Sequence, residues 1–215
     1  MSQAARAGDT TSHGTLLAPG PGCPTVLVGY QPAWRSLPSG MASAVEGLSN
    51  AMDSFMKRPQ MTPADATASL VQISARLIAG GAAAAAHGAA AATATAASSS
   101  AALNATNATL AATWATASVV PGGQPAANIA YTEGIKAAAA AAASAVFSAM
   151  AGISDMHVCP LPCPIPPHGP GFVTRGSGTV VIGNLPAARQ NDTVFEACGG
   201  TDPIALGCPT VNIGG

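Results

Sequence analysis

A short glycine-bounded pattern occurs three times in this chain, once near the N-terminus and twice near the C-terminus. Residues 22–29, 176–183 and 207–214 each read Gly, a small residue, Pro or Gly, Thr, Val, any residue, an aliphatic residue and Gly. β-Branched runs of this length between glycines are typical of short strands. One such strand cannot bury a face alone, whereas copies stacked around an axis can. The pattern therefore predicts one repeat-built β unit that uses both ends of the chain.

The repeat continues beyond the strand, because a Pro-Ala-x-Arg sequence follows the first two copies at residues 32–35 and 186–189. The first copy is separated from the others by a long helical region, so the simplest arrangement is one β unit interrupted by an insertion. We expect the two chain ends to meet in space. The predicted boundaries are a first β repeat over residues 1–40, inserted helices over 41–152, and the main part of the β unit over 153–215.

Helix signals fill the middle of the chain. Residues 41–56 carry apolar side chains three and four positions apart, the period of an amphipathic helix. Residues 62–65 read Thr-Pro-Ala-Asp, a helix-start signature, and we expect the second helix to end at Gly80-Gly81. A turn is predicted at 119–124 and a further helix over 137–150.

No Asp, Glu, Lys or Arg lies between Arg76 and Glu133, a stretch made almost entirely of Ala, Thr, Ser, Gly and Asn. Two interpretations stay open. The stretch exceeds the roughly 20 residues needed to cross a bilayer, and its small residues allow close helix contact. Alternatively, Ala-rich helices pack against each other or a partner, since Ala favours helix but contributes little transfer energy. Asn104 and Asn107 favour the packed arrangement.

The composition narrows the classes of protein to which this chain can belong. Only 8% of residues are charged and 4% aromatic, so we expect stability to come from a metal, repeats or a partner surface rather than a large core. A net charge of -1 without a basic run excludes a nucleic-acid surface. Five cysteines and no apolar signal segment at the N-terminus indicate reduced thiols in the cytoplasm, where cysteines mixed with histidines favour metal binding.

Several histidines and cysteines stand in Gly- and Pro-rich turns, the mix from which closed tetrahedral zinc sites are made. These candidates are His13, His157, His168, Cys159, Cys163 and Cys198. Spacing alone leaves the ligand set open, because Cys159 and Cys163 form a rival pair. Cys23 and Cys208 take the small-residue position that Ser177 fills in the second copy, so we interpret them as structural. The chain has no His-Glu-x-x-His and no Gly-x-Ser-x-Gly, and we expect no enzymatic activity.

Residues 155–215 resemble the PAAR family, which caps the spike of type VI secretion systems and related contractile injection machines. The resemblance rests on Asp155-Met156-His157-Val158-Cys159-Pro160, Pro167-His168-Gly169, Pro186 to Arg189, Cys198 and the closing strand. Residues 4–13 look like the prePAAR motif, Ala-Ala-Arg-x-x-Asp-x-x-x-His. The resemblance selects four ligands for one structural zinc ion, namely His13, His157, His168 and Cys198. Trp34 departs from the family pattern, since it replaces the second alanine of the first Pro-Ala-Ala-Arg.

This resemblance implies an α+β fold: a small conical β-repeat unit closed by the N- and C-terminal segments, with an inserted Ala-rich helical region. It implies a base seated on the trimeric VgrG spike, zinc near the pointed end, and a mechanical role in puncturing membranes and carrying or recruiting effectors. An Eag-type chaperone is a further implied partner. We expect no C-terminal toxin domain. Either the cargo binds noncovalently, or the protein serves only as the tip.

We expect a cytoplasmic protein that is translocated with the spike on firing. The alternative is a membrane-active effector whose helical insertion enters the target membrane, with the PAAR unit as its carrier.

Overall fold

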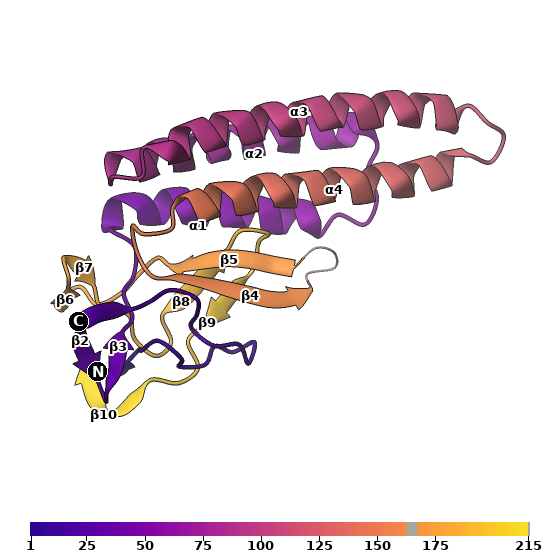
Figure 1. The fold of residues 1–215 in the computed structure, drawn as a ribbon. Coiled ribbons are helices and arrows are strands. Elements are labelled where there is room, and N and C mark those ends of the chain that lie inside the picture. Colours follow the sequence, from indigo (N-terminus) through magenta and orange to yellow (C-terminus); the bar gives the residue numbers. More distant parts are fainter. Residues whose placement is uncertain (163–166, 215) are drawn as a thin grey trace.

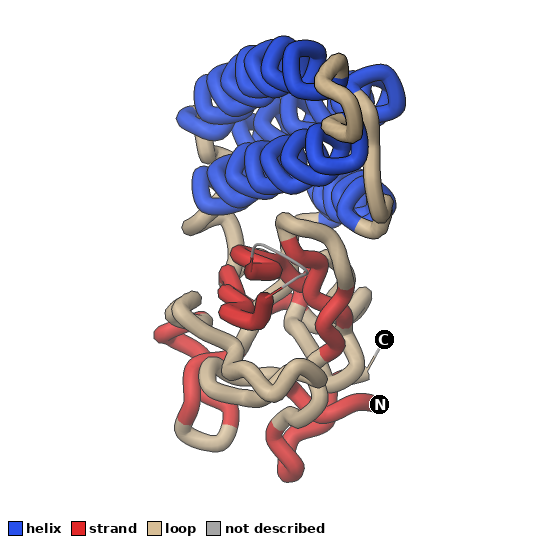
Figure 2. The backbone as a smooth tube through the Cα atoms, turned by 90° about the vertical axis from the view of Figure 1, so that its right-hand side faces the viewer, coloured by secondary structure: helices blue, strands red, loops and turns tan. Residues whose placement is uncertain are grey.

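The computed structural model describes residues 1–162 and 167–214. Four helices lie on one side and the short strands on the other (Figures 1 and 2), so the predicted α+β class is confirmed. The helices are α1 (Ser39–Met56), α2 (Pro63–Ala86), α3 (Ala91–Ser118) and α4 (Gln124–Ala149). The strands are β1 (Ser2–Ala4), β2 (Cys23–Val28), β3 (Gln31–Ala33), β4 (Met156–Pro162), β5 (Pro167–Val173), β6 (Val181–Ile182), β7 (Leu185–Pro186), β8 (Thr193–Glu196), β9 (Thr201–Pro203) and β10 (Cys208–Ile213).

The second helix does not end at Gly80-Gly81 as predicted, but continues to Ala86. Both glycines are buried at helix contacts. A Cβ on Gly81 would lie 2.5 Å from the Ala96 Cβ and 2.6 Å from the Ala92 carbonyl oxygen of α3. The prediction was wrong because these glycines permit close approach of two helices rather than stopping one.

The fourth helix is longer than predicted, since it begins at Gln124 instead of residue 137. Its first half is fixed to α3 by polar contacts that an apolar period does not reveal. The Tyr131 hydroxyl donates to Asn107 Oδ1 at 2.6 Å, and the Trp114 indole N–H donates to Asn128 Oδ1 at 2.7 Å. Asn107, whose polar side chain favoured packed helices over a membrane span, thus joins two helices.

The α3–α4 hairpin, called the arm below, continues past the other helices and past the β unit (Figure 1). Val119 and Val120 lie at its far turn with 79% and 58% of their surface exposed. Among the described helices, only α2 is long and apolar enough to cross a membrane by length and composition. The large apolar side chains Leu70, Ile73 and Leu77 of that helix are buried in the bundle core.

Three two-stranded antiparallel pairs repeat in the β unit: the hairpins β2–β3 and β6–β7, and the pair β10–β1, which the two chain ends form without a turn; all three pairs are called hairpins below. In the third, Ser2 pairs with Ile213, so the two chain ends meet as expected (Figure 1). The turns of the first two use positive φ at Gly29-Tyr30 and Gly183-Asn184. Two consecutive residues of this kind form the turn that matches the twist of a two-residue hairpin. The three sequence repeats are therefore three hairpins.

The hairpins are arranged around a pseudo-threefold axis. The Ala5 N–H donates to the Ala188 carbonyl at 2.9 Å, Ala188 donates to Trp34 at 2.9 Å, and Trp34 donates back to Ala5 at 2.8 Å. Each of these residues follows the first alanine of its repeat, and together they close a ring of backbone hydrogen bonds. The Trp34 side chain is fully buried beside Ala5 and Ala188 in one small apolar cluster.

Each hairpin is followed by an arginine that binds an aspartate. The backbone N–H groups of Arg6, Arg35 and Arg189 donate to carboxylate oxygens at 2.8, 2.8 and 2.7 Å. The partners are Asp9, Asp155 and Asp192, and the guanidinium groups bind the same carboxylates. In two copies the pair spans three residues, whereas Arg35 and Asp155 are separated by all four helices. The helical region is thus an insertion into one Arg–Asp turn.

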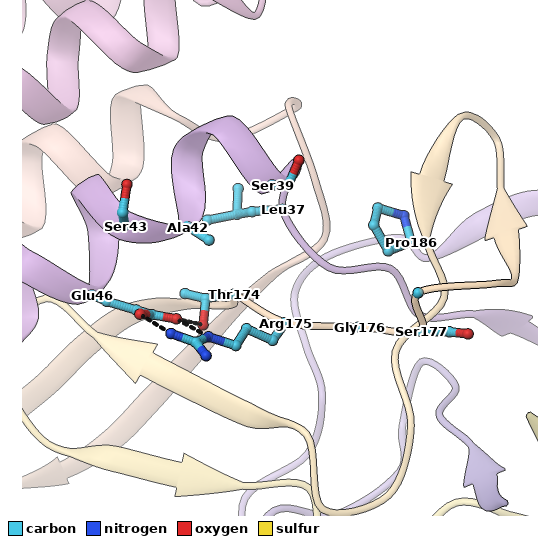
Figure 3. A pocket seen from close by; sticks show the side chains of 11 residues that line it. Leu37, Ser39, Ala42, Ser43, Glu46, Thr174, Arg175, Gly176, Ser177 and Pro186 are labelled. Atoms are coloured by element: carbon cyan, nitrogen blue, oxygen red, sulfur yellow. Dashed lines mark hydrogen bonds and ion pairs between the residues drawn. The ribbon is translucent and has the colours of Figure 1, made fainter. Parts of the chain in front are cut away.

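The bundle packs on the β unit at one face. Phe147 of α4 contacts Phe172 of β5 with ring centroids 5.9 Å apart. Glu46 of α1 accepts hydrogen bonds from the Thr174 hydroxyl and the Arg175 guanidinium, each at 2.8 Å (Figure 3). A cavity of about 390 Å³ lies beside this ion pair, between α1 and the start of the second repeat. Apolar packing and a polar clamp together fix the bundle on the β unit.

Candidate metal centre

Six side chains that can ligate metal come together in the β unit, from the four-stranded sheet β4-β5-β8-β9 and the loop after Asp9. They are His13, His157, Cys159, His168, Glu196 and Asp202. They form two overlapping groups, in each of which all ligand atoms lie within 4.8 Å of one another. One group contains His13, Cys159, His168 and Glu196, and the other contains His157, Cys159, Glu196 and Asp202. Cys159 and Glu196 belong to both.

Three buried carboxylate oxygens of this cluster accept no hydrogen bond from the described residues. Both side-chain oxygens of Glu196 and Oδ2 of Asp202 have no hydrogen-bond partner among the described residues, although both side chains are fully buried. His168 Nδ1 lies 2.5 Å from Glu196 Oε2, an ion-pair contact without hydrogen-bond geometry. Unpaired charge in a protein interior is costly, so such atoms call for a cation. The donor set fits a divalent metal that accepts nitrogen, sulfur and oxygen ligands.

The histidines present the form that binds metal. His157 Nδ1 lies 2.9 Å from the Leu16 carbonyl oxygen, so it carries the proton and leaves Nε2 to face the cluster. Burial lowers the pKa of His157 and of His168. Their imidazoles are therefore neutral at physiological pH, with a lone pair available for a metal.

The pKa values of the acidic side chains in the cluster shift in the opposite direction. Burial, followed by the charge of Asp202, raises the pKa of Glu196 to about 8. Burial likewise raises the pKa of the Cys159 thiol to about 11. A bound cation reverses these shifts, because it favours the thiolate and the carboxylate, and metal binding then releases protons.

His13, His157 and His168 each belong to one of the two groups, whereas Cys198 lies next to them, with its backbone N–H donating to the His168 carbonyl at 3.2 Å. Cys198 belongs to neither group found among the described residues. Its Sγ lies 3.9 Å from Ser144 Oγ of α4, within the cluster that packs under the helices. Cys159 is the thiol of both groups, and Cys163 lies outside the described residues.

Sequence reasoning did not place the two carboxylates in the ligand set. Glu196 ends β8 and Asp202 lies in β9, on neighbouring strands in which Val194 pairs with Asp202 and Phe195 with Thr201. Asp202 also holds the loop of His13, since its Oδ1 accepts from the backbone N–H of His13 at 2.9 Å. The three hairpins with their Arg–Asp turns and this ligand cluster define a small repeat-built β module with a candidate metal site.

The comparisons with known proteins agree with this class. Residues 165–215 match the family model of the PAAR motif. No curated protein and no solved structure gives a significant match. The chain therefore carries a PAAR motif over residues 165–215, and the matched segment contains His168, Glu196 and Asp202 together with the second and third repeat strands.

Proposed function

We propose that this protein is a zinc-stabilised tip that caps the trimeric VgrG spike of a type VI secretion system. The observation that supports the proposal most is the pseudo-threefold arrangement of the hairpins in a chain that carries the PAAR motif. A single chain that repeats one surface three times can offer equivalent contacts to each subunit of a trimer. The role is mechanical: the tip sharpens the spike, is made in the cytoplasm, and leaves the cell when the sheath contracts.

The proposed docking face is the end of the β unit where the hairpins β2–β3 and β6–β7 gather with both chain termini (Figure 1). Large side chains are exposed there: Leu27 at 59%, Tyr30 at 93% and Val181 at 63%. Apolar residues that gather on an otherwise ordinary surface mark a contact region. Leu27 and Val181 stand on the equivalent strands of two repeats, so both would meet the same part of two different subunits.

Copurification of the full chain with the trimeric VgrG protein encoded in the same genome tests this proposal. We expect a stable complex with one chain per trimer, and loss of that complex for Leu27→Glu with Val181→Glu. Val71→Glu on the outer face of α2, where Val71 is 65% exposed, is the matched control and should bind normally. Failure of the wild-type chain to bind any such trimer would overturn the proposal.

Zinc stabilisation is supported by the donor set and by the small size of the apolar clusters in the β unit. A structural zinc contributes its binding free energy to folding when bound to a thiolate and neutral imidazoles. We expect metal analysis of the purified protein to find one zinc ion per chain. A metal-free protein whose β unit is folded would contradict this part of the proposal.

We also propose that the helical insertion serves delivery, through a noncovalent effector or a chaperone that binds it before firing. A second candidate function is entry of the insertion into the target membrane. The observation that favours it is the arm, whose helix α3 has no charged residue and whose turn exposes Val119 and Val120. Liposomes mixed with the full-length protein should then shield the arm from added protease. No shielding at any pH would contradict the membrane role.

A further inference from the structure

The three repeat copies meet at the ligand cluster, and each contributes one side chain from the same position. In every copy an arginine binds an aspartate, and a ligand-type residue stands four positions after that aspartate. Asp9 precedes His13, Asp155 precedes Cys159, and Asp192 precedes Glu196 in this way. The rule holds across the helical insertion, which separates Arg35 from Asp155 but leaves the spacing from Asp155 onward unchanged.

These three side chains are also close in space. Cys159 Sγ lies 3.6 Å from His13 Nδ1, and His13 Nδ1 lies 3.7 Å from Glu196 Oε1. Ligand atoms around a tetrahedral zinc ion are roughly 3.3–3.8 Å apart, as bond lengths of about 2.0–2.3 Å require. His168 completes the group, because one of its ring nitrogens lies within 4.8 Å of the other ligand atoms; its Nδ1 faces Glu196.

We propose that the metal lies on the pseudo-threefold axis, bound by His13, Cys159 and Glu196, one from each repeat, with His168 of β5 as the fourth ligand. The proposal deepens the zinc-stabilised tip proposed above and rests on it. It departs from the set that the family resemblance implies, since Cys159 replaces Cys198 and Glu196 replaces His157.

The charge of the ligands favours this ligand set over a set made of three histidines and Cys198. A thiolate and a carboxylate together carry two negative charges, which match the charge of a divalent cation. If Glu196 were not a ligand, a carboxyl group that is fully buried and has no described hydrogen-bond partner would lie beside the metal without binding it. Burying polar groups without partners is strongly unfavourable.

His157 and Asp202 then form the layer around the ligands. Asp202 Oδ1 accepts from the Ser12 hydroxyl at 2.8 Å and from the His13 backbone N–H at 2.9 Å, while its Oδ2 lies 3.3 Å from His13 Nδ1. His157 Nε2 lies 3.7 Å from the same Oδ2 and is held from behind by Leu16. Asp202 is therefore a positioning residue, which holds the backbone of the loop that carries His13.

Cobalt titration of the full chain tests the assignment, because a thiolate bound to Co²⁺ gives a charge-transfer band in the near ultraviolet. We expect Cys159→His to bind Co²⁺ in a tetrahedral site without this band. Cys198→Ser is the matched control and should retain the band at wild-type intensity. A band that disappears in Cys198→Ser and persists in Cys159→His would overturn the assignment of the thiolate.

The carboxylate is tested by affinity. We expect Glu196→Gln to weaken Co²⁺ and Zn²⁺ binding by more than about 100-fold, whereas Asp202→Asn stays within the roughly 10- to 100-fold range of outer-layer residues. Glu196→His keeps a ligand and should restore tetrahedral binding even if Glu196→Gln folds poorly. Unchanged affinity in Glu196→Gln would overturn this ligand. A wild-type chain that binds no metal would instead overturn the zinc-stabilised tip itself.

Discussion

The helical bundle and the β unit of this protein are stabilised in different ways. One apolar cluster runs through all four helices, from Met41 of α1 to Met150 after α4. The β unit has only two small clusters of its own, and adds to them a ring of backbone hydrogen bonds, three Arg–Asp pairs and a metal-ligand cluster. The bundle therefore depends on buried area, whereas the β unit depends on closure and on polar contacts of fixed geometry.

We expect metal removal to give the largest difference in stability between the two regions. A ligand that binds only the folded state stabilises it by about 4 kcal/mol when present at roughly 1,000 times its dissociation constant. We expect chelation of the full chain to abolish hydrogen-exchange protection in β8 and β9 while α3 and α4 keep theirs. Equal loss of protection in both regions would show that they unfold as one unit. It would contradict the prediction that they are stabilised differently.

The Arg–Asp pair that spans the insertion should be the most sensitive polar contact. Asp155→Ala leaves the Arg35 guanidinium, 18% exposed, without its carboxylate. Breaking a buried pair in this way costs about 3–5 kcal/mol. The control is Asp53→Ala, whose exposed pair with Lys57 contributes below about 1 kcal/mol. Urea unfolding measures both, and equal midpoints for the two variants would refute the prediction.

Within the bundle, two adjacent glycines should behave differently. Gly81→Ala forces a methyl group against the Ala92 backbone and should destabilise the protein, since overpacking costs about 1–3 kcal/mol. At Gly80 the nearest atom is the flexible Met150 Cε at 3.3 Å. Gly80→Ala should therefore be neutral or stabilising, because alanine gains up to about 1 kcal/mol over glycine in a helix. Thermal unfolding of the pair measures the difference.

The clamp between the regions should give the smallest effect. Hydrogen bonds from Arg175 lower the pKa of Glu46 below its ordinary value of 4.5. A lowered pKa stabilises the fold above pH 4.5, and this stabilisation is lost as pH falls through the folded-state value. Because Arg175 is 80% exposed, solvent screens this pair, and we expect its contribution to be the smallest of the four. Glu46→Gln should flatten the pH dependence of the urea midpoint in that range; an unchanged slope would contradict it.

The repeat made much of the β unit predictable from the sequence. The three glycine-bounded segments predicted three strands, and their distribution predicted that the chain ends meet, as the pairing of Ser2 with Ile213 confirms. Local pattern was sufficient there, because β2–β3 and β6–β7 use the same kind of turn residues and the strand pattern repeats in β10. It was not sufficient at Gly80-Gly81, where the deciding contact comes from α3, or at the start of α4, where hydrogen bonds replace apolar periodicity.

The ligand cluster was only partly predictable. Histidines in turns are visible in a sequence, and His13, His157 and His168 were found in this way. Glu196 resembles any strand carboxylate until its spacing from Asp192 is compared with those of His13 and Cys159. That comparison requires the insertion to be recognised inside an Arg–Asp turn, which depends on contacts between residues far apart in the chain.

The third hairpin has a consequence for how this protein is made. Its strands are β1 and β10, so Ser2 must wait for Ile213 before it can pair. At about 5–20 residues per second, a ribosome needs roughly 10–40 s to cover that distance. The helices can form during this interval, while the loop of His13 has no sheet to join. Strand β1 therefore stays without its partner on the nascent chain until β10 has left the ribosome, and the metal centre cannot assemble before β8 and β9 supply Glu196 and Asp202.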